Sequence, residues 1–249
     1  MIIIKSQDEI EKIARACKIV AEVLRDLRDL VEPGITTKDI EIFVDKTLAE
    51  KNAIAAFRGY RNYPSSVCTS VNDQVVHGIP SNLRLREGDI LSIDLGVYLE
   101  GFYGDGAITL PVGKISPTAE RLLRVTEDAL YIGIEKARPG NRVSDISSSI
   151  QRYVESHGYS VVRSFVGHGI GRSLHEEPQV PNYGSPGQGP RLREGMTLAI
   201  EPMVNEGTYD VKILDDGWTA VTADGKLSAH YEHTVAITKN GARILTKID

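Results

Sequence analysis

A ten-residue phrase that occurs twice constrains the fold of this chain more than any other feature. LREGDILSID at residues 85–94 returns as LREGMTLAIE at residues 192–201, with six of ten positions identical. Each copy is a charged turn with glycine and then an apolar run that closes on an acid, Asp94 in the first copy and Glu201 in the second. This pattern predicts a turn that leads into a buried strand with a carboxylate at its end. Two such acids in two related halves predict a shared site between the halves.

Helix signals precede each copy of the phrase. Ser6 with Glu9 is a capping-box pattern, and apolar residues at helical spacing follow it up to the Pro-Gly break at residues 33–34. Thr36 opens a second helix with the same kind of cap. In the second half, Ser116 precedes a proline at the first helical position, and Ser144 opens a further helix. The sequence therefore predicts two helices before each copy.

Three landmarks keep nearly the same spacing in both halves. The Pro-Gly breaks are 106 residues apart (139 − 33), FRGY and FVGH are 108 apart (165 − 57), and the LREG copies are 107 apart (192 − 85). Such register is typical of a duplicated unit. We therefore predict a single α+β domain over residues 1–249, made of two related halves at about 1–113 and 114–249. Helices should cover one face of a curved, mostly antiparallel sheet with pseudo-twofold symmetry, and the other face should hold the site.

The C-terminal part is rich in strand and turn signals. Asp224-Gly225 and Asn240-Gly241 predict hairpin turns, and residues 101–113 predict a further strand pair that carries Asp105. In that pair Asp105 corresponds to Glu232 of the second half. The two halves thus supply two matched pairs of acids.

Composition excludes several kinds of partner. A net charge of −5 and a pI near 5.7 leave no basic face for sequence-specific nucleic-acid binding. The three apolar residues near the start are too few for a signal peptide, and no apolar run reaches the length of a membrane span. The two cysteines, Cys17 and Cys68, form no metal or disulfide motif, which is typical of a reducing compartment. We expect a cytoplasmic protein that does not bind membranes.

The matched acids form the candidate metal site, together with a histidine that the repeat aligns with Tyr60. The set is Asp94, Asp105, His168, Glu201 and Glu232. Burying several carboxylates together is too costly unless cations neutralise them, and two divalent metals bridged by carboxylates would do so. An oxygen-rich set with one imidazole favours manganese, iron or cobalt, with zinc or magnesium as alternatives. The opposing interpretation is a set of strand-end acids that are solvated or paired with basic side chains.

The histidines outside this set carry weaker signals. His77 lies at a Gly-Pro turn and His175 in a loop after a glycine run, where backbone could approach a substrate closely. The segment is not an HExxH zinc motif, because Gln179 occupies the place of the second histidine, and GHGIG is not a dinucleotide-binding GxGxxG motif. The remaining histidines are interpreted as structural: His157, His230 and His233.

Several of these motifs together resemble the methionine aminopeptidases. The motifs are VVHGIP, DLGVYLEGFYGDGA, FVGHGIGRSLHEEPQVPNYG, LAIEPM and AHYEHTVAIT, and they cover nearly the whole chain in order. The chain looks like the short type I form found in bacteria. The resemblance implies the pita-bread fold, a dinuclear metal centre and removal of the initiator methionine before a small second residue. It also implies a monomer that acts on peptides and on nascent-chain N-termini at the ribosome.

The resemblance further implies a role for each candidate ligand. Asp94 would bind one metal, His168 and Glu201 would hold the other, and Asp105 and Glu232 would bridge the two. A water activated by the metals would attack the scissile carbonyl while Glu201 handles the proton.

Substrate contacts are also implied by the resemblance. His77 and His175 would hold the substrate and stabilise the developing oxyanion. The methionine side chain would lie among Tyr60, Tyr63, Cys68, Phe165, Leu174 and Trp218. A monovalent cation would lie near Asn72, Gln74 and Ser228.

Two alternatives remain open at this point. A proline-specific peptidase on the same fold would release proline-linked dipeptides, although such enzymes generally carry an additional N-terminal domain. A relative that has lost its metals would act as a binding module. Retention of all five candidate ligands disfavours this second alternative.

Overall fold

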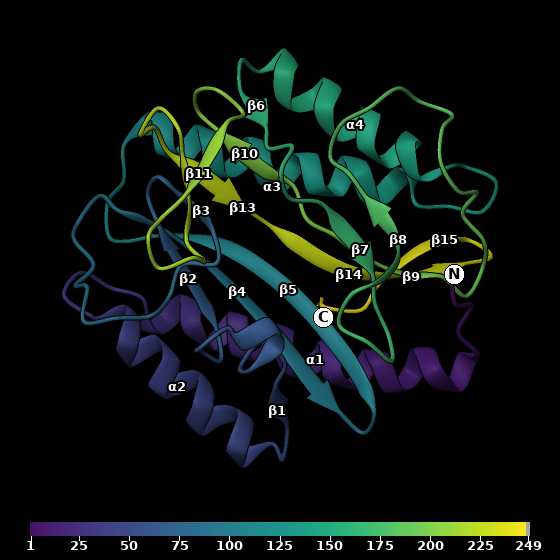
Figure 1. Ribbon diagram of the computed structural model, residues 1–249, viewed down its shortest axis with the longest axis horizontal. Coiled ribbons are helices and arrows are strands. Elements are labelled where there is room, and N and C mark those ends of the chain that lie inside the picture. The colour runs from purple at the N-terminus through teal and green to yellow at the C-terminus, as the bar shows by residue number, and fades with distance from the viewer. Residues whose placement is uncertain (248–249) are drawn as a thin grey trace.

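The computed structural model describes residues 1–247 and is built on a nine-stranded sheet with helices on one of its faces (Figure 1). Every strand pair in it is antiparallel. The strands of the large sheet are, in order, β1 (Ile54–Ala55), β4 (Ile90–Leu99), β5 (Phe102–Pro111), β14 (Glu232–Thr238), β9 (Thr197–Ile200), β7 (Gly167–Gly169) and β8 (Glu176–Val180), with β2 (Cys68–Val71) paired to β4 and β15 (Gly241–Ile244) paired to β14.

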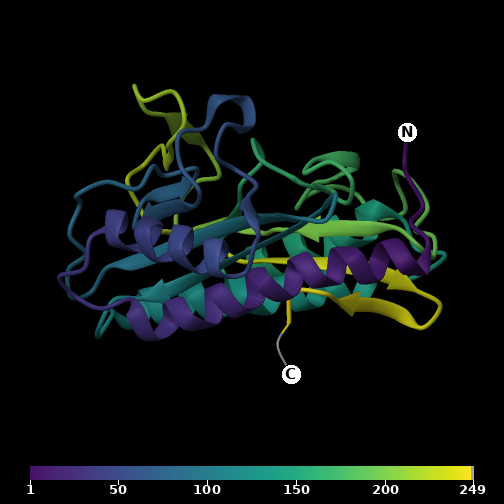
Figure 2. The same ribbon diagram turned by 90° about the horizontal axis from the view of Figure 1, so that it is seen from below.

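Two small sheets stand beside the large one. The first joins β13 (Ser228–His230), β10 (Met203–Asn205) and β6 (Ser160–Val161), and the second joins β11 (Val211–Ile213), β12 (Ala220–Thr222) and β3 (Gln74–Val76). Figure 2 shows the β11–β12 hairpin on the side of the large sheet opposite to the first helix. This hairpin therefore rises over the face that the helices leave free.

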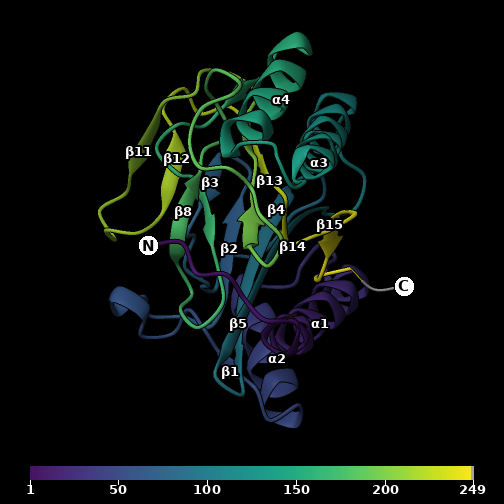
Figure 3. The same cartoon turned by 90° about the vertical axis from the view of Figure 1, so that its right-hand side faces the viewer.

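The helices form two pairs, one from each half of the chain. They are α1 (Gln7–Leu30), α2 (Thr37–Glu50), α3 (Pro117–Lys136) and α4 (Val143–Ser156), and a short 3-10 helix, η1, covers Tyr60–Asn62. Figure 3 shows α1 with α2 at one end of the sheet and α3 with α4 at the other. None of the helices within residues 1–247 is long and apolar enough to cross a membrane.

Local sequence explains where three of the helices begin. The Ser6 hydroxyl accepts from the backbone N–H of Glu9, whose carboxylate accepts from the N–H of Ser6, and Thr36 with Asp39 repeats this box at α2. The Ser116 hydroxyl caps α3, with proline at its first position. Each cap satisfies backbone donors that lack partners within the helix. The predicted starts of α1, α2 and α3 are confirmed.

The start predicted for α4 is wrong by one residue. The backbone N–H of Arg142 donates to the carboxylate of Asp145 at 2.7 Å, so the helix begins at Val143. The Ser144 hydroxyl instead donates to the carbonyl of Gln188 at 2.8 Å. Ser144 therefore ties the helix to a distant loop and does not cap it.

Close packing of α1 on the sheet supports the strand that carries Asp105. A Cβ atom on Gly104 would lie 2.6 Å from the backbone nitrogen of Cys17, so only glycine permits this approach. The apolar face of α1, including Ile13, Val20 and Leu27, is fully buried. This contact holds β5 against α1. Asp105, the next residue of the strand, is left free on the opposite face of the sheet.

A local twofold relation lies between β5 and β14. Gly106 pairs with His233 across these strands, and each of the two residues directly follows an acid. A twofold axis through that pair carries Asp105 onto Glu232. The predicted equivalence of these two acids agrees with the strand register.

The predicted equivalence of Tyr60 and His168 is wrong. His168 lies in β7, which pairs with β9, and the strand in the corresponding place beside β4 is β2. Tyr60 lies outside the sheet, in η1. The counterpart of the histidine is therefore in β2. The similarity of FRGY and FVGH does not reflect strand pairing.

Three β predictions also need correction. Asn240-Gly241 forms the β14–β15 hairpin as predicted, but Asp224-Gly225 connects β12 to β13, which belong to different sheets. Residues 101–113 contain one long strand, β5, which pairs with β4 and not within itself. Asp94 lies in the middle of β4 and not at its end, whereas Glu201 directly follows β9.

Candidate metal centre and substrate pocket

All five predicted metal ligands line one pocket on the helix-free face of the sheet. They come from β4, β5, β7, the end of β9 and the start of β14, and they are Asp94, Asp105, His168, Glu201 and Glu232. Each half of the chain thus delivers carboxylates to the centre of the sheet. The sequence prediction that these residues converge is confirmed by their positions.

The compact core of this group is Asp105, His168 and Glu232, which offer ligand atoms within 4.8 Å of one another. The Nε2 atom of His168 lies 3.9 Å from Oδ2 of Asp105 and 3.6 Å from Oε1 of Glu201. Nδ1 of His168 lies 2.9 Å from the carbonyl of Gly169, which can only accept a hydrogen bond. Nδ1 therefore carries the proton, and the lone pair of Nε2 faces the carboxylates, as a metal ligand requires.

The four acids repel one another strongly in the absence of cations. Burial, reinforced by the neighbouring carboxylates, raises the pKa values of Asp94, Glu201 and Glu232 well above their usual range, and burial also raises the pKa of Asp105. Oδ1 of Asp94 and Oε1 of Glu232 are buried without a hydrogen-bond partner among residues 1–247. Within the same residues, no lysine or arginine forms an ion pair with any of the four acids.

Divalent cations fit this donor set. They would neutralise the carboxylates and use the lone pairs that now have no partner. The alternative of solvated or basic-paired acids does not match the buried, unpaired oxygens.

Apolar and aromatic side chains form the other wall of the pocket. Of the residues predicted to contact substrate, those that line the pocket are Tyr60, Tyr63, Cys68, His77, Leu174, His175 and Trp218. The rings of Tyr63 and Trp218 meet edge to face with centroids 5.1 Å apart. Phe165 is the exception, because it lies outside this lining and packs edge-on against the His77 ring at 5.2 Å.

A recognised sequence family matches almost the whole length of the chain. The profile of metallopeptidase family M24 matches residues 11–239. The chain belongs to metallopeptidase family M24. Membership of a metallopeptidase family implies a divalent metal, which the buried carboxylate cluster accommodates.

Individual M24 relatives are similar over the full length. The methionine aminopeptidase of Clostridium perfringens is 56% identical and is covered over 100% of both chains. The crystal structure of methionine aminopeptidase from Thermotoga maritima has a TM-score of 0.98 at 50% identity, again over 100% of both chains. The prolidase of Pyrococcus horikoshii has a TM-score of 0.80 at 25% identity, and this chain covers 64% of it. The resemblance to the methionine aminopeptidases and the expected pita-bread fold are confirmed.

His77 of this M24 chain occupies a strained turn at the pocket. Its φ of 61° lies in the left-handed region, which is uncommon for a residue other than glycine. The turn is held because the carbonyl of Gly78 accepts from the Tyr63 hydroxyl at 2.9 Å and from the backbone N–H of Thr69 at 2.8 Å. The strain is therefore offset by contacts that point the imidazole into the pocket.

The glycines around His168 have a different role from the one predicted. A Cβ atom on Gly167 would lie 2.4 Å from the carbonyl oxygen of Ala199, and one on Gly169 would lie 2.3 Å from that of Glu177. Both glycines thus allow β7 to fit between its neighbouring strands. Close approach of a substrate is not what requires them.

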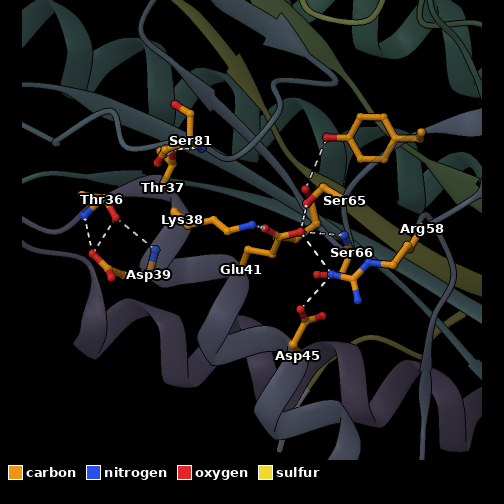
Figure 4. Close-up of polar contacts among 12 residues, drawn as sticks. Thr36, Thr37, Lys38, Asp39, Glu41, Asp45, Arg58, Ser65, Ser66 and Ser81 are labelled. Carbon is orange, nitrogen blue, oxygen red and sulfur yellow. Dashed lines mark hydrogen bonds and ion pairs between the residues drawn. The ribbon is translucent and has the colours of Figure 1, made fainter.

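A buried carboxylate on α2 anchors the loop that carries Tyr60 and Tyr63 (Figure 4). Glu41 is 4% exposed and accepts from the Ser65 hydroxyl at 2.6 Å. Lys38 and Arg58 pair with the same carboxylate. The helix therefore fixes one wall of the pocket through a single acid.

A second buried carboxylate anchors the loop that carries Leu174 and His175. Glu176 accepts from the backbone N–H groups of Arg172 at 2.8 Å and Ser173 at 3.1 Å, and it forms an ion pair with Lys5. The side chain of Lys5 is 1% exposed and that of Glu176 is 4% exposed. The N-terminal segment thus holds the opposite wall of the pocket.

Replacing Lys5 by methionine is expected to destabilise the protein by about 3–5 kcal/mol, because the Glu176 carboxylate would be left buried without its counter-ion. Arg15→Met is the matched control, since the Arg15–Glu100 pair is more than half exposed and should contribute less than about 1 kcal/mol. Urea denaturation of the three proteins measures both effects. Equal losses in the two variants would contradict the role given to the buried pair.

Sequence reasoning missed three residues near the pocket. Phe57 and Arg61 line it from the segment around η1, where the FRGY landmark and the candidate Tyr60 were the available signals. His230 was interpreted as structural, yet its Nε2 atom lies 3.7 Å from Oε2 of Glu201. Its position two residues before Glu232 in extended chain places both side chains on one face, which is a signal that could have revealed it.

The residues of the predicted monovalent-cation site lie close together, but their side chains are already engaged. Asn72 bonds to Asp89 and to the backbone of Ile90, and Gln74 accepts from the N–H of Val71 at 2.9 Å. The Ser228 hydroxyl lies 2.8 Å from Asn205. A cation there would rely on backbone carbonyls.

Proposed function

We propose that this M24 chain removes the N-terminal methionine from peptides and nascent proteins with two divalent metals. The observation that carries the proposal is the juxtaposition of a buried carboxylate cluster with an apolar pocket in a chain whose full-length relatives are methionine aminopeptidases. A pocket wall of aromatic rings, Leu174 and the Cys68 sulfur suits an unbranched, polarizable thioether side chain. We assign this function to a single catalytic domain made of the two related halves.

The proposed ligand roles are those that the resemblance to the methionine aminopeptidases implies. Asp94 would hold one metal and His168 with Glu201 the other, while Asp105 and Glu232 would bridge both. Manganese, iron or cobalt suits this oxygen-rich set best, with zinc or magnesium as alternatives. Bound metals would acidify a water molecule and polarise the scissile carbonyl.

The protein groups would perform the remaining steps. Glu201 would take the proton of the attacking water and pass it to the leaving amine. Nδ1 of His175 lies 2.8 Å from the Tyr60 hydroxyl, and if that hydroxyl donates, Nε2–H of His175 is free to donate to the developing oxyanion. His77, on the other side of the pocket, would orient the substrate.

We also propose a second-residue preference, a cellular location, an oligomeric state and a monovalent-cation site for this chain. We propose a small second residue, as the resemblance to the methionine aminopeptidases implies. We assign the activity to a cytoplasmic monomer that acts on nascent chains at the ribosome, with a monovalent cation held by backbone carbonyls near Asn72, Gln74 and Ser228.

Metal-free protein titrated with manganese, iron or cobalt, and assayed on a Met-Ala-Ser peptide, tests the function. Methionine release that depends on added metal is the expected result. Release of proline-linked dipeptides in its place would favour a proline-specific peptidase. Inactivity on both substrates with every metal would overturn the proposal.

A further inference from the structure

His230 has a buried ring nitrogen that the proposed mechanism leaves unused. The residue is 1% exposed and ends β13, two positions before Glu232. Its Nε2 atom has no hydrogen-bond partner among residues 1–247, and it lies 3.7 Å from Oε2 of Glu201. A buried polar atom without a partner is costly, so its retention beside a predicted metal ligand needs an explanation.

Two imidazoles face the two oxygens of the Glu201 carboxylate. His168 approaches Oε1 at 3.6 Å, and His230 approaches Oε2 at 3.7 Å. His168 belongs to the compact group of potential ligand atoms with Asp105 and Glu232, whereas His230 belongs to no such group in the described part of the chain. Oε1 is thus the oxygen turned toward the metal cluster, and Oε2 is turned toward His230.

The backbones of both partners are held in place. The Thr109 hydroxyl donates to the carbonyl of His230 at 2.8 Å and accepts from its N–H at 2.9 Å. The side-chain amide of Asn182 donates to the carbonyl of Glu201 at 2.9 Å. With both main chains fixed, a small rotation of the Glu201 carboxylate would shorten the 3.7 Å separation to hydrogen-bond length.

We infer that His230 is a positioning residue: its Nε2–H donates to Oε2 of Glu201 and keeps Oε1 directed at the metal shared with His168. The inference rests on the proposed function and extends it. Groups that hydrogen-bond a metal-ligating carboxylate orient it, and their loss typically lowers metal affinity about 10- to 100-fold. His230 therefore acts on the metal through Glu201 and does not bind it.

Calorimetric titration of the metal-free full chain with manganese tests the first consequence. His230→Leu should weaken binding by about 10- to 100-fold, because leucine fills the space without donating a hydrogen bond. His230→Gln should largely restore affinity, since its amide N–H can reach the same oxygen. His157→Gln, at the half-buried C-cap of α4 and outside the pocket, is the control and should bind manganese as the unaltered chain does.

Nitrogen-15 NMR of the unaltered chain loaded with cadmium-113 tests the second consequence and needs no variant to fold. His168 should show nitrogen–cadmium coupling at Nε2. His230 should show a protonated Nε2 without such coupling. Coupling at His230, or wild-type manganese affinity in His230→Leu, would overturn the inference. Failure of the unaltered chain to bind any divalent metal would instead overturn the proposed function from which the inference starts.

Discussion

Asp105→Ala and Glu232→Ala are each expected to abolish metal-dependent methionine release while the fold is retained. Both acids offer oxygens within 4.8 Å of the His168 ring nitrogen and lie at equivalent places across the central twofold relation. In the proposed centre each of them bridges both metals, so loss of either removes a ligand from two ions at once. Methionine release across a manganese titration measures the effect, and circular dichroism verifies the fold.

Glu135→Ala provides the matched control for these variants. Glu135 is an exposed carboxylate in the last turn of α3, and its removal should leave activity and metal affinity unchanged. Normal metal-dependent activity in Asp105→Ala or Glu232→Ala would refute the bridging assignment.

His175→Ala is expected to lower turnover by about 100-fold or more while metal binding is spared. The ring lies 4.2 Å from that of His168, centroid to centroid, but Nδ1 is engaged by the Tyr60 hydroxyl and not by the carboxylate cluster. The residue is therefore placed to donate to the reacting carbonyl and not to hold a metal. Comparison of kcat with the manganese titration separates the two roles.

Tyr60→Phe refines this test because it removes only the partner of Nδ1. The imidazole would remain but Nδ1 would lose its hydrogen-bond partner, so a smaller loss of turnover is expected than for His175→Ala. If His175→Ala lost manganese affinity as well, the residue would be a ligand and the oxyanion role would be wrong.

The convergence of the five candidate ligands could be predicted from sequence because its signals are local and duplicated. The repeated phrase ending on Asp94 and Glu201 marks two strands, and the apolar surroundings of Asp105 and Glu232 mark two more acids that cannot be buried alone. The helix caps at Ser6 and Ser116 could likewise be predicted from sequence, because a cap involves residues only three positions apart.

The structural features that could not be predicted from sequence depend on contacts between distant segments of the chain. The predicted equivalence of Tyr60 and His168 was wrong because strand register is set by tertiary pairing and not by the similarity of short sequence motifs. The Lys5–Glu176 pair joins residues 171 positions apart, so no local sequence pattern predicts it. The spacing of His230 from Glu232 places it near the site, but its contact with Glu201, which follows β9, comes from a distant segment of the chain.

Anomalous diffraction from crystals soaked in manganese would test the central claim most directly. Two manganese peaks about 3.5–4 Å apart are expected between Asp105 and Glu232, one beside Asp94 and the other beside His168 and Glu201. Absence of manganese from this cluster in a chain that still releases methionine would contradict it.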